Sequence, residues 1–144
     1  MFVGFGERRR ITVVKDIEKV LVILKRLRVI SGRTRFQKLV FLLENKDHVG
    51  LSYHFIPYFY GPYSSGLQIE IDMLEASNLI QVVSESGNLY VHCLTKDGAK
   101  VAAGVERRME TLEKDRLFGA LKQYKKKATS SLIREAKQLA NMPV

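Results

Sequence analysis

Three cations lie where the sequence predicts the start of a helix. Arg33 and Arg35 come just after Gly32, and Lys38 follows one turn later. Basic residues in a first helical turn oppose the helix dipole, at a cost of about 0.3–1 kcal/mol. A phosphate would reverse this cost, because free backbone N–H groups and the three cations could hold it together. We expect both arginines to be exposed. The alternatives are a solvated cluster or pairing with an acidic residue such as Glu70.

Two further basic runs could contact phosphates without sequence preference. Arg8, Arg9 and Arg10 form the first run, and Lys125 and Lys126 begin the second, which continues to residue 127. The alternatives are a solvated tail for the first and a helix end for the second, where lysines suit the dipole. With Arg33, Arg35 and Lys38, these residues are the predicted nucleic-acid or anion-binding set.

Catalytic and metal chemistry has little support in the sequence. His48, His54 and His92 do not have the spacing of metal ligands. Cys93 is adjacent to His92, so on a strand their side chains face opposite ways. Ser64 and its neighbour are better explained as helix caps than as nucleophiles. We therefore expect no enzyme activity, no metal and no cofactor.

An aromatic segment could stack nucleobases. Its six rings lie between positions 53 and 63, and no basic residue interleaves them. The absence of cations favours a different interpretation, in which a strand and a turn pack on the core. Within this segment, Tyr60 and Tyr63 flank Gly61-Pro62 in a predicted turn.

The elements that must position these residues follow from hydrophobic periodicity and turn residues. The sequence predicts helices near 12–30, 35–45 and 65–77, a strand at 53–59, a β-hairpin of 79–84 with 89–94, and two or three helices from 95 to 142. Capping boxes are predicted at Thr34 with Gln37 and at Ser65 with Gln68, and Thr95 is expected to cap the next helix. Gly104, Gly119 and the stretch 128–131 are the expected breaks.

The charge pattern conflicts with conventional DNA reading. The chain has a net charge of +9 and a pI near 9.8, which favours a polyanionic partner. Between Asp47 and Lys96, however, the chain contains no Lys or Arg, and Glu70 lies in the helix that would read bases. Recognition helices normally present basic or amide side chains, so we expect nucleic acid to bind elsewhere.

Three motifs resemble a known family. They are the segment 36–43 (FQKLVFLL), the segment 58–64 (YFYGPYS) and the segment 74–80 (LEASNLI). Across roughly residues 15–100 the chain is similar to the YwgA and Panacea (SocA-like antitoxin) group. Asn78 stands where that group often has Gly, and Asn also adopts the left-handed conformation. The resemblance implies a winged-helix-like fold and a regulatory or partner-binding role, without a catalytic site.

The predicted fold is α+β and predominantly helical. Residues 1–100 are expected to form a winged helix-turn-helix-like core with N-terminal helices, and residues 101–144 a C-terminal helical extension of the same globular unit. The predicted function is a non-enzymatic regulatory module that binds nucleic acid through its basic flanks. The alternative is an antitoxin-like or adaptor-like module that binds a protein through Tyr60, Tyr63 and Glu70.

Location and assembly complete the expectations. A single cysteine fits a reducing compartment, no apolar run could span a membrane, and charge comes too early for a signal peptide, so we expect a cytoplasmic protein. The last helix carries an apolar stripe that includes Leu132, Ala136 and Leu139. A short helix needs a packing partner, so we predict a homodimer through this stripe. A monomer with the helix folded back is the alternative.

Overall fold

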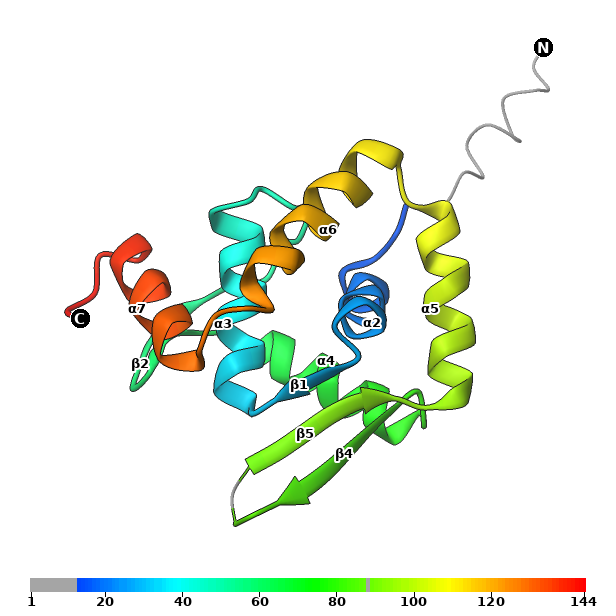
Figure 1. Cartoon of the computed structure of the whole chain (residues 1–144), viewed down its shortest axis with the longest axis horizontal. Helices are drawn as coiled ribbons and strands as arrows, with labels where there is room; N and C mark the ends of the chain where they lie inside the picture. Colours follow the sequence, from blue (N-terminus) through cyan, green and yellow to red (C-terminus); the bar gives the residue numbers. More distant parts are fainter. Residues whose placement is uncertain (1–12, 88) are drawn as a thin grey trace.

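The computed structural model describes residues 13–87 and 89–144 (Figure 1). Its elements follow in the order α2 (Asp16–Leu27), β1 (Val29–Ser31), α3 (Arg33–Asn45), β2 (Ile56–Tyr58), β3 (Gly61–Tyr63), α4 (Ser65–Ala76), β4 (Ile80–Glu85), β5 (Leu89–Leu94), α5 (Lys96–Arg108), α6 (Thr111–Tyr124) and α7 (Thr129–Leu139). The predicted class, α+β and predominantly helical, is confirmed.

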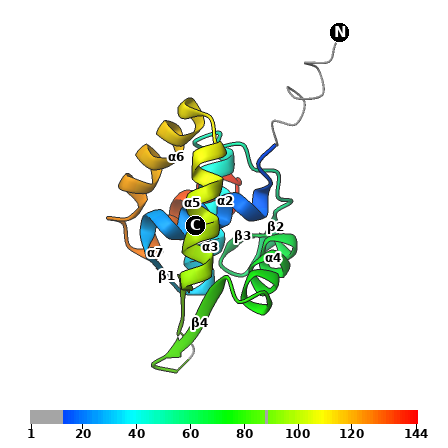
Figure 2. The same cartoon turned by 90° about the vertical axis from the view of Figure 1, so that its right-hand side faces the viewer.

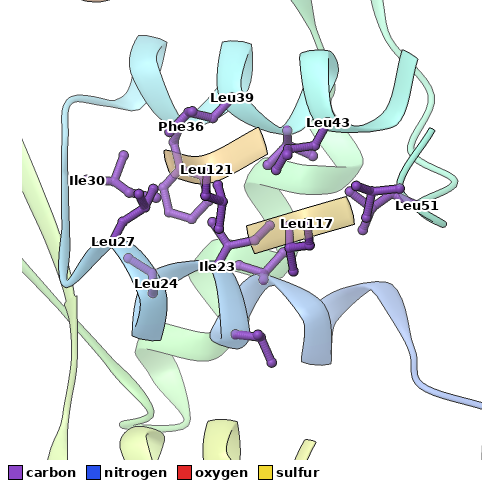
Figure 3. Close-up of a cluster of buried hydrophobic side chains, with 14 of the residues drawn as sticks. Ile23, Leu24, Leu27, Ile30, Phe36, Leu39, Leu43, Leu51, Leu117 and Leu121 are labelled. Atoms are coloured by element: carbon purple, nitrogen blue, oxygen red, sulfur yellow. The ribbon is translucent and has the colours of Figure 1, made fainter. Parts of the chain in front are cut away.

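Helix α2 runs between α5 and α6 (Figure 1). Val20, Val22 and Ile23 point to different sides of this helix, and all three are fully buried. A helix that is apolar on several sides needs neighbours around it. Figure 3 shows how α2, α3 and α6 share the core through Ile23, Leu24, Leu27, Phe36, Leu39, Leu43, Leu117 and Leu121.

The larger sheet has the antiparallel order β1-β5-β4. Strand β1 was not predicted, because its three residues follow α2 after only Arg28, whose φ is +72°. It pairs with β5 so that Ile30 lies opposite His92. The β4–β5 hairpin, predicted from its turn, extends from the helical body (Figures 1 and 2).

The starts of α3 and α4 differ from the predicted capping boxes. Gly32 is the N-cap of α3, so Thr34 lies inside the helix. Gln37 is buried, and its amide donates to the Ser64 carbonyl oxygen at 2.9 Å and accepts from the Ser64 N–H at 2.8 Å. Ser64, not Ser65, caps α4, because its hydroxyl oxygen accepts from a backbone N–H in the first turn.

Predictions for the remaining boundaries had mixed outcomes. Thr95 caps α5 as expected, with its hydroxyl accepting from Gly98 N–H at 2.9 Å. Gly104 and Gly119 were expected to break helices, but they lie inside α5 and α6. Tertiary packing thus overrides the low helix propensity of glycine. The predicted strand at 53–59 is limited to β2, and the expected turn at 60–63 contains β3.

The last helix folds back onto the same chain. Helix α7 packs against α3 and β3, and Leu132 and Ala136 are fully buried there. The stripe that suggested a dimer is therefore covered within the chain, although Leu139 at its end is exposed. Homodimerisation stays a prediction, without this stripe as its basis. No helix in the described ranges combines the length and apolar character needed to cross a bilayer.

Candidate nucleic-acid interface and an adjoining cavity

The N-terminus of α3 offers open backbone donors. Its N-cap, Gly32, has a φ of +104° and no side chain with which to accept from the first turn. The first turn contains no acidic residue. The Gly32 N–H itself donates to the Tyr90 carbonyl oxygen at 2.8 Å, which fixes the helix start against β5. The positive end of the helix dipole is thus left without a negative side chain.

Arg35 is a structural residue, contrary to the prediction that it is exposed. Its guanidinium donates to the Tyr124 carbonyl oxygen at 3.0 Å and to the Thr129 hydroxyl at 3.2 Å. Burial lowers the pKa of Arg35. Because Tyr124 ends α6 and Thr129 begins α7, this one side chain holds the connection between those helices against α3.

The same contacts join Arg35 to the segment that carries a second group of basic residues. Lys125 and Lys126 directly follow Tyr124, and both are exposed. Arg33 is also exposed, and its guanidinium lies 4.1 Å from the centre of the Tyr90 ring. Among the described residues, neither Arg33 nor Arg35 forms an ion pair, so the predicted alternative of pairing with Glu70 is wrong. We call the set Arg33, Arg35, Lys125 and Lys126 the basic edge.

A hollow of about 600 Å³ lies beside the basic edge. It is lined by Ser31, Gly32, Arg33, Thr34, Arg35, Leu89, Tyr90 and Thr129. The hollow therefore opens between the start of α3, the start of β5 and the start of α7. The third predicted basic group, Arg8, Arg9 and Arg10, lies outside the described residues.

Lys38, which was predicted to hold an anion together with Arg33 and Arg35, is buried. Only 2% of the residue is exposed, and its ammonium donates to the Pro62 carbonyl oxygen at 3.0 Å. It forms no ion pair with any carboxylate in the described part of the chain. Burial, and then the positive charge of Lys137, lower the pKa of Lys38 to about 8. The charge here is costly and has no opposite charge to offset it.

Gly61 is required where it crosses the Lys38 side chain. Its φ is +112°, and a Cβ at this position would lie 3.1 Å from Lys38 Cε and 3.4 Å from Lys137 Cγ. A side chain would therefore be strained in backbone conformation and crowded by both lysines. The absence of a side chain lets β3 lie directly on α3 and α7.

A cavity of about 250 Å³ opens beside Lys38. Its walls come from α3, from the β2–β3 hairpin and from α4. The lining residues are Arg33, Thr34, Gln37, Lys38, Tyr58, Tyr60, Tyr63, Gln68 and Asp72. Residues predicted for two different roles, the anion-binding Arg33 and Lys38 and the partner-binding Tyr60 and Tyr63, therefore share one site.

The aromatic segment divides into a packed part and an exposed part. Phe55 packs edge-on against Phe41 of the core, with ring centres 5.1 Å apart. Phe59, at the tip of the hairpin, is 78% exposed, and Tyr58 and Tyr60 are also exposed. The prediction that the whole segment packs on the core is thus wrong for its second half. These rings lie on the β2–β3 hairpin, where they are exposed to solvent, and the sequence pattern did not indicate this hairpin.

Glu70 faces the other flank of α4. It accepts a hydrogen bond from the Tyr53 hydroxyl, and burial together with this carboxylate raises the pKa of Tyr53. Glu70 therefore anchors the segment before β2. On the cavity flank, Gln68 donates to Asp72 at 3.0 Å, which orients that carboxylate.

The histidine and cysteine candidates do not converge. His92 is buried, its Nδ1 lies 3.0 Å from the Ile30 carbonyl oxygen, and its ring meets Phe36 edge-on. Within residues 13–87 and 89–144, no three His, Cys, Asp or Glu side chains are placed to hold a metal ion.

Comparison of the chain with protein-family models, with curated proteins and with solved structures gave no match. The basic edge and the tyrosine-lined cavity remain as the two candidate sites.

Sequence reasoning missed Tyr58, Gln68 and Asp72 as residues of one site. Tyr58 belongs to a hairpin whose second strand has only three residues, and Gln68 was interpreted as part of a capping box. The one available signal was spacing, because positions 68 and 72 share a helix face. Nothing in the sequence showed that this face meets α3.

Proposed function

We propose that the chain is a non-enzymatic regulatory module that binds nucleic acid through the basic edge. One observation carries this proposal: Arg35 ties the end of α6 to the start of α3. The tie joins the segment that carries Lys125 and Lys126 to the first turn of α3, which lacks a side-chain cap and acidic residues. Cations and open backbone donors together favour phosphate groups, with no need for a particular base sequence.

The order of elements supports a winged-helix-like form of this module. Helices α2, α3 and α4 are followed by the β4–β5 hairpin, and β1 adds a third strand beside it. That order is typical of winged helices, in which the hairpin is the wing. In the conventional arrangement the third helix would read bases. Here α4 carries Glu70, Asp72 and Glu75, so phosphates would be repelled from it.

A titration with random-sequence duplex DNA tests the proposal. Binding should be present at about 50 mM salt and weaken steeply as salt is raised, because phosphate contacts release counterions. Two unrelated duplexes of equal length should bind with the same affinity. Failure to bind either duplex at the lower salt concentration would contradict the proposal.

A second candidate function is a protein-interaction module, antitoxin-like or adaptor-like. The exposed aromatic tip of the β2–β3 hairpin, with Tyr58, Phe59 and Tyr60, favours it. Exposed aromatic side chains are typical of interface centres. The variant Phe59→Ser should lose such a partner while duplex binding is unchanged. Loss of duplex binding in the same variant would count against a separate protein-binding surface.

A further inference from the structure

The cavity beside Lys38 holds a buried positive charge that forms no ion pair within the described residues, although the Asp72 carboxylate lines the same cavity. An ammonium has three N–H donors, and the one acceptor found for Lys38 is the Pro62 carbonyl oxygen. A second cation, Arg33, lines the same cavity. Burying a charge without a partner is unfavourable, so an anionic group entering the cavity would gain two charge-assisted contacts.

The other walls suit a flat ring with hydrogen-bond donors. Tyr58 and Tyr63 lie with ring centres 5.2 Å apart, and Tyr60 adds a third ring at the opening. From α4, Asp72 lines the same cavity as an acceptor whose carboxylate is oriented by Gln68. Tyrosine rings stack on nucleobases of any type. A carboxylate accepts from the amino and imino groups of bases.

The folded chain supplies the cations that the aromatic segment lacks in sequence. No basic residue lies among the six rings between positions 53 and 63. In the folded chain, α3 supplies Arg33 and Lys38 to the tyrosines of the hairpin. Basic side chains, tyrosine rings and the Asp72 acceptor therefore line one cavity of about 250 Å³.

We propose that this cavity binds one nucleotide, with its phosphate toward Arg33 and Lys38, its base against the tyrosines, and base N–H donors toward Asp72. The inference deepens the proposed function and rests on it in one respect. Arg33 lines both this cavity and the hollow beside the basic edge, so an unpaired end of a bound strand can place its last nucleotide here. A free nucleoside monophosphate has the same chemistry.

Calorimetric titration with guanosine 5′-monophosphate tests the site. This probe offers a phosphate and two adjacent N–H donors on its base. It should bind the wild-type chain more tightly than guanosine or benzoate. Lys38→Met and Asp72→Asn should each weaken binding by about tenfold or more, since each removes a charged partner. Lys96→Ala, at an exposed position of α5, should have no effect.

Two results would overturn the proposal. One is no binding of the monophosphate at about 1 mM, the weak end of specific affinity. The other is equal binding of benzoate, which would indicate a general carboxylate site. Because Lys38→Met alters a buried side chain, Tyr60→Ala at the exposed rim provides a second test, and it should weaken binding with no change in thermal unfolding.

Duplexes with and without a single-stranded overhang separate the two sources of the nucleotide. Tighter binding of the overhang than of the blunt duplex, abolished by Tyr60→Ala, supports a strand end. Monophosphate binding without an overhang effect supports a free nucleotide. Duplex binding without monophosphate binding contradicts this inference alone, whereas monophosphate binding without duplex binding contradicts the proposed function alone.

Discussion

Arg35 donates a hydrogen bond to the carbonyl oxygen of Tyr124, 89 positions further along the chain. Carbonyl groups at a helix C-terminus lack partners within the helix, and a guanidinium both satisfies and electrostatically stabilises one. The residue therefore serves the fold directly and the basic edge indirectly, by fixing where Lys125 and Lys126 lie. Structural and binding roles at this edge can be separated experimentally.

Arg35→Ala should lower the free energy of unfolding by about 1–3 kcal/mol, because the Tyr124 carbonyl loses its charged donor. Arg33→Ala should lower it by less than about 1 kcal/mol, since this side chain is exposed and stacks on Tyr90. Urea unfolding of both variants measures the difference. Equal losses would show that the Arg35 contacts contribute little to stability.

Replacing Lys125 and Lys126 together by Ala should reduce the salt dependence of duplex binding. Each lost phosphate contact lowers the slope of log affinity against log salt by about 0.9, so the pair should lower it by roughly 2. The matched control replaces Lys96 and Lys100, which are exposed on α5 and carry the same total charge. If both double variants changed the slope equally, net charge rather than the basic edge would govern binding.

Lys38 should make stability depend on pH between about 8 and its ordinary value of 10.5. The folded-state pKa is the lower one, so in this window the unfolded chain binds more protons, and stability rises with pH. Relative to Lys38→Met, the wild-type chain should gain about 2 kcal/mol between about pH 7 and about pH 9.5. Unfolding curves of both proteins across this range measure the gain. Parallel pH profiles would refute it.

Gly61→Ala should destabilise the fold by about 1–3 kcal/mol, the range expected for a non-glycine residue in a strained conformation. Gly87→Ala is the matched control, because its φ is also positive, at +79°, but a Cβ there meets nothing within 4 Å. The difference between the two variants measures the contact with Lys38 and Lys137. Equal thermal shifts would mean that backbone strain alone explains Gly61.

The helices and the hairpin were predictable, because their signals are local. Thr95 was recognised from its position before a helical pattern, and the β4–β5 hairpin from its turn residues. Arg35 was wrongly expected to be exposed, and the burial of Lys38 was not foreseen, because a lysine or arginine is normally exposed. Their acceptors are the backbone carbonyl groups of Tyr124 and Pro62. Every residue has a backbone carbonyl group, so the side-chain pattern of a sequence does not indicate which carbonyl will accept such a hydrogen bond. The cavity was not predictable either, because its shape depends on the position of the β2–β3 hairpin, which is also held by hydrogen bonds to backbone atoms.

The adjacent side chains of Gln37 and Lys38 both bind the backbone of the segment 62–64. The Gln37 amide accepts from the Ser64 N–H and donates to the Ser64 carbonyl oxygen, the same pair of hydrogen bonds that a neighbouring strand would form. The Lys38 ammonium donates to the Pro62 carbonyl oxygen. Two residues of α3 therefore set the register of the hairpin and the starting point of α4. The residues between Asn45 and Ile56 are fixed independently, because Val49 and Leu51 are buried in the core and Tyr53 hydrogen-bonds to Glu44 and Glu70. A change of length in this connection would therefore disturb the core at Val49 and Leu51 before it reached the register of the hairpin.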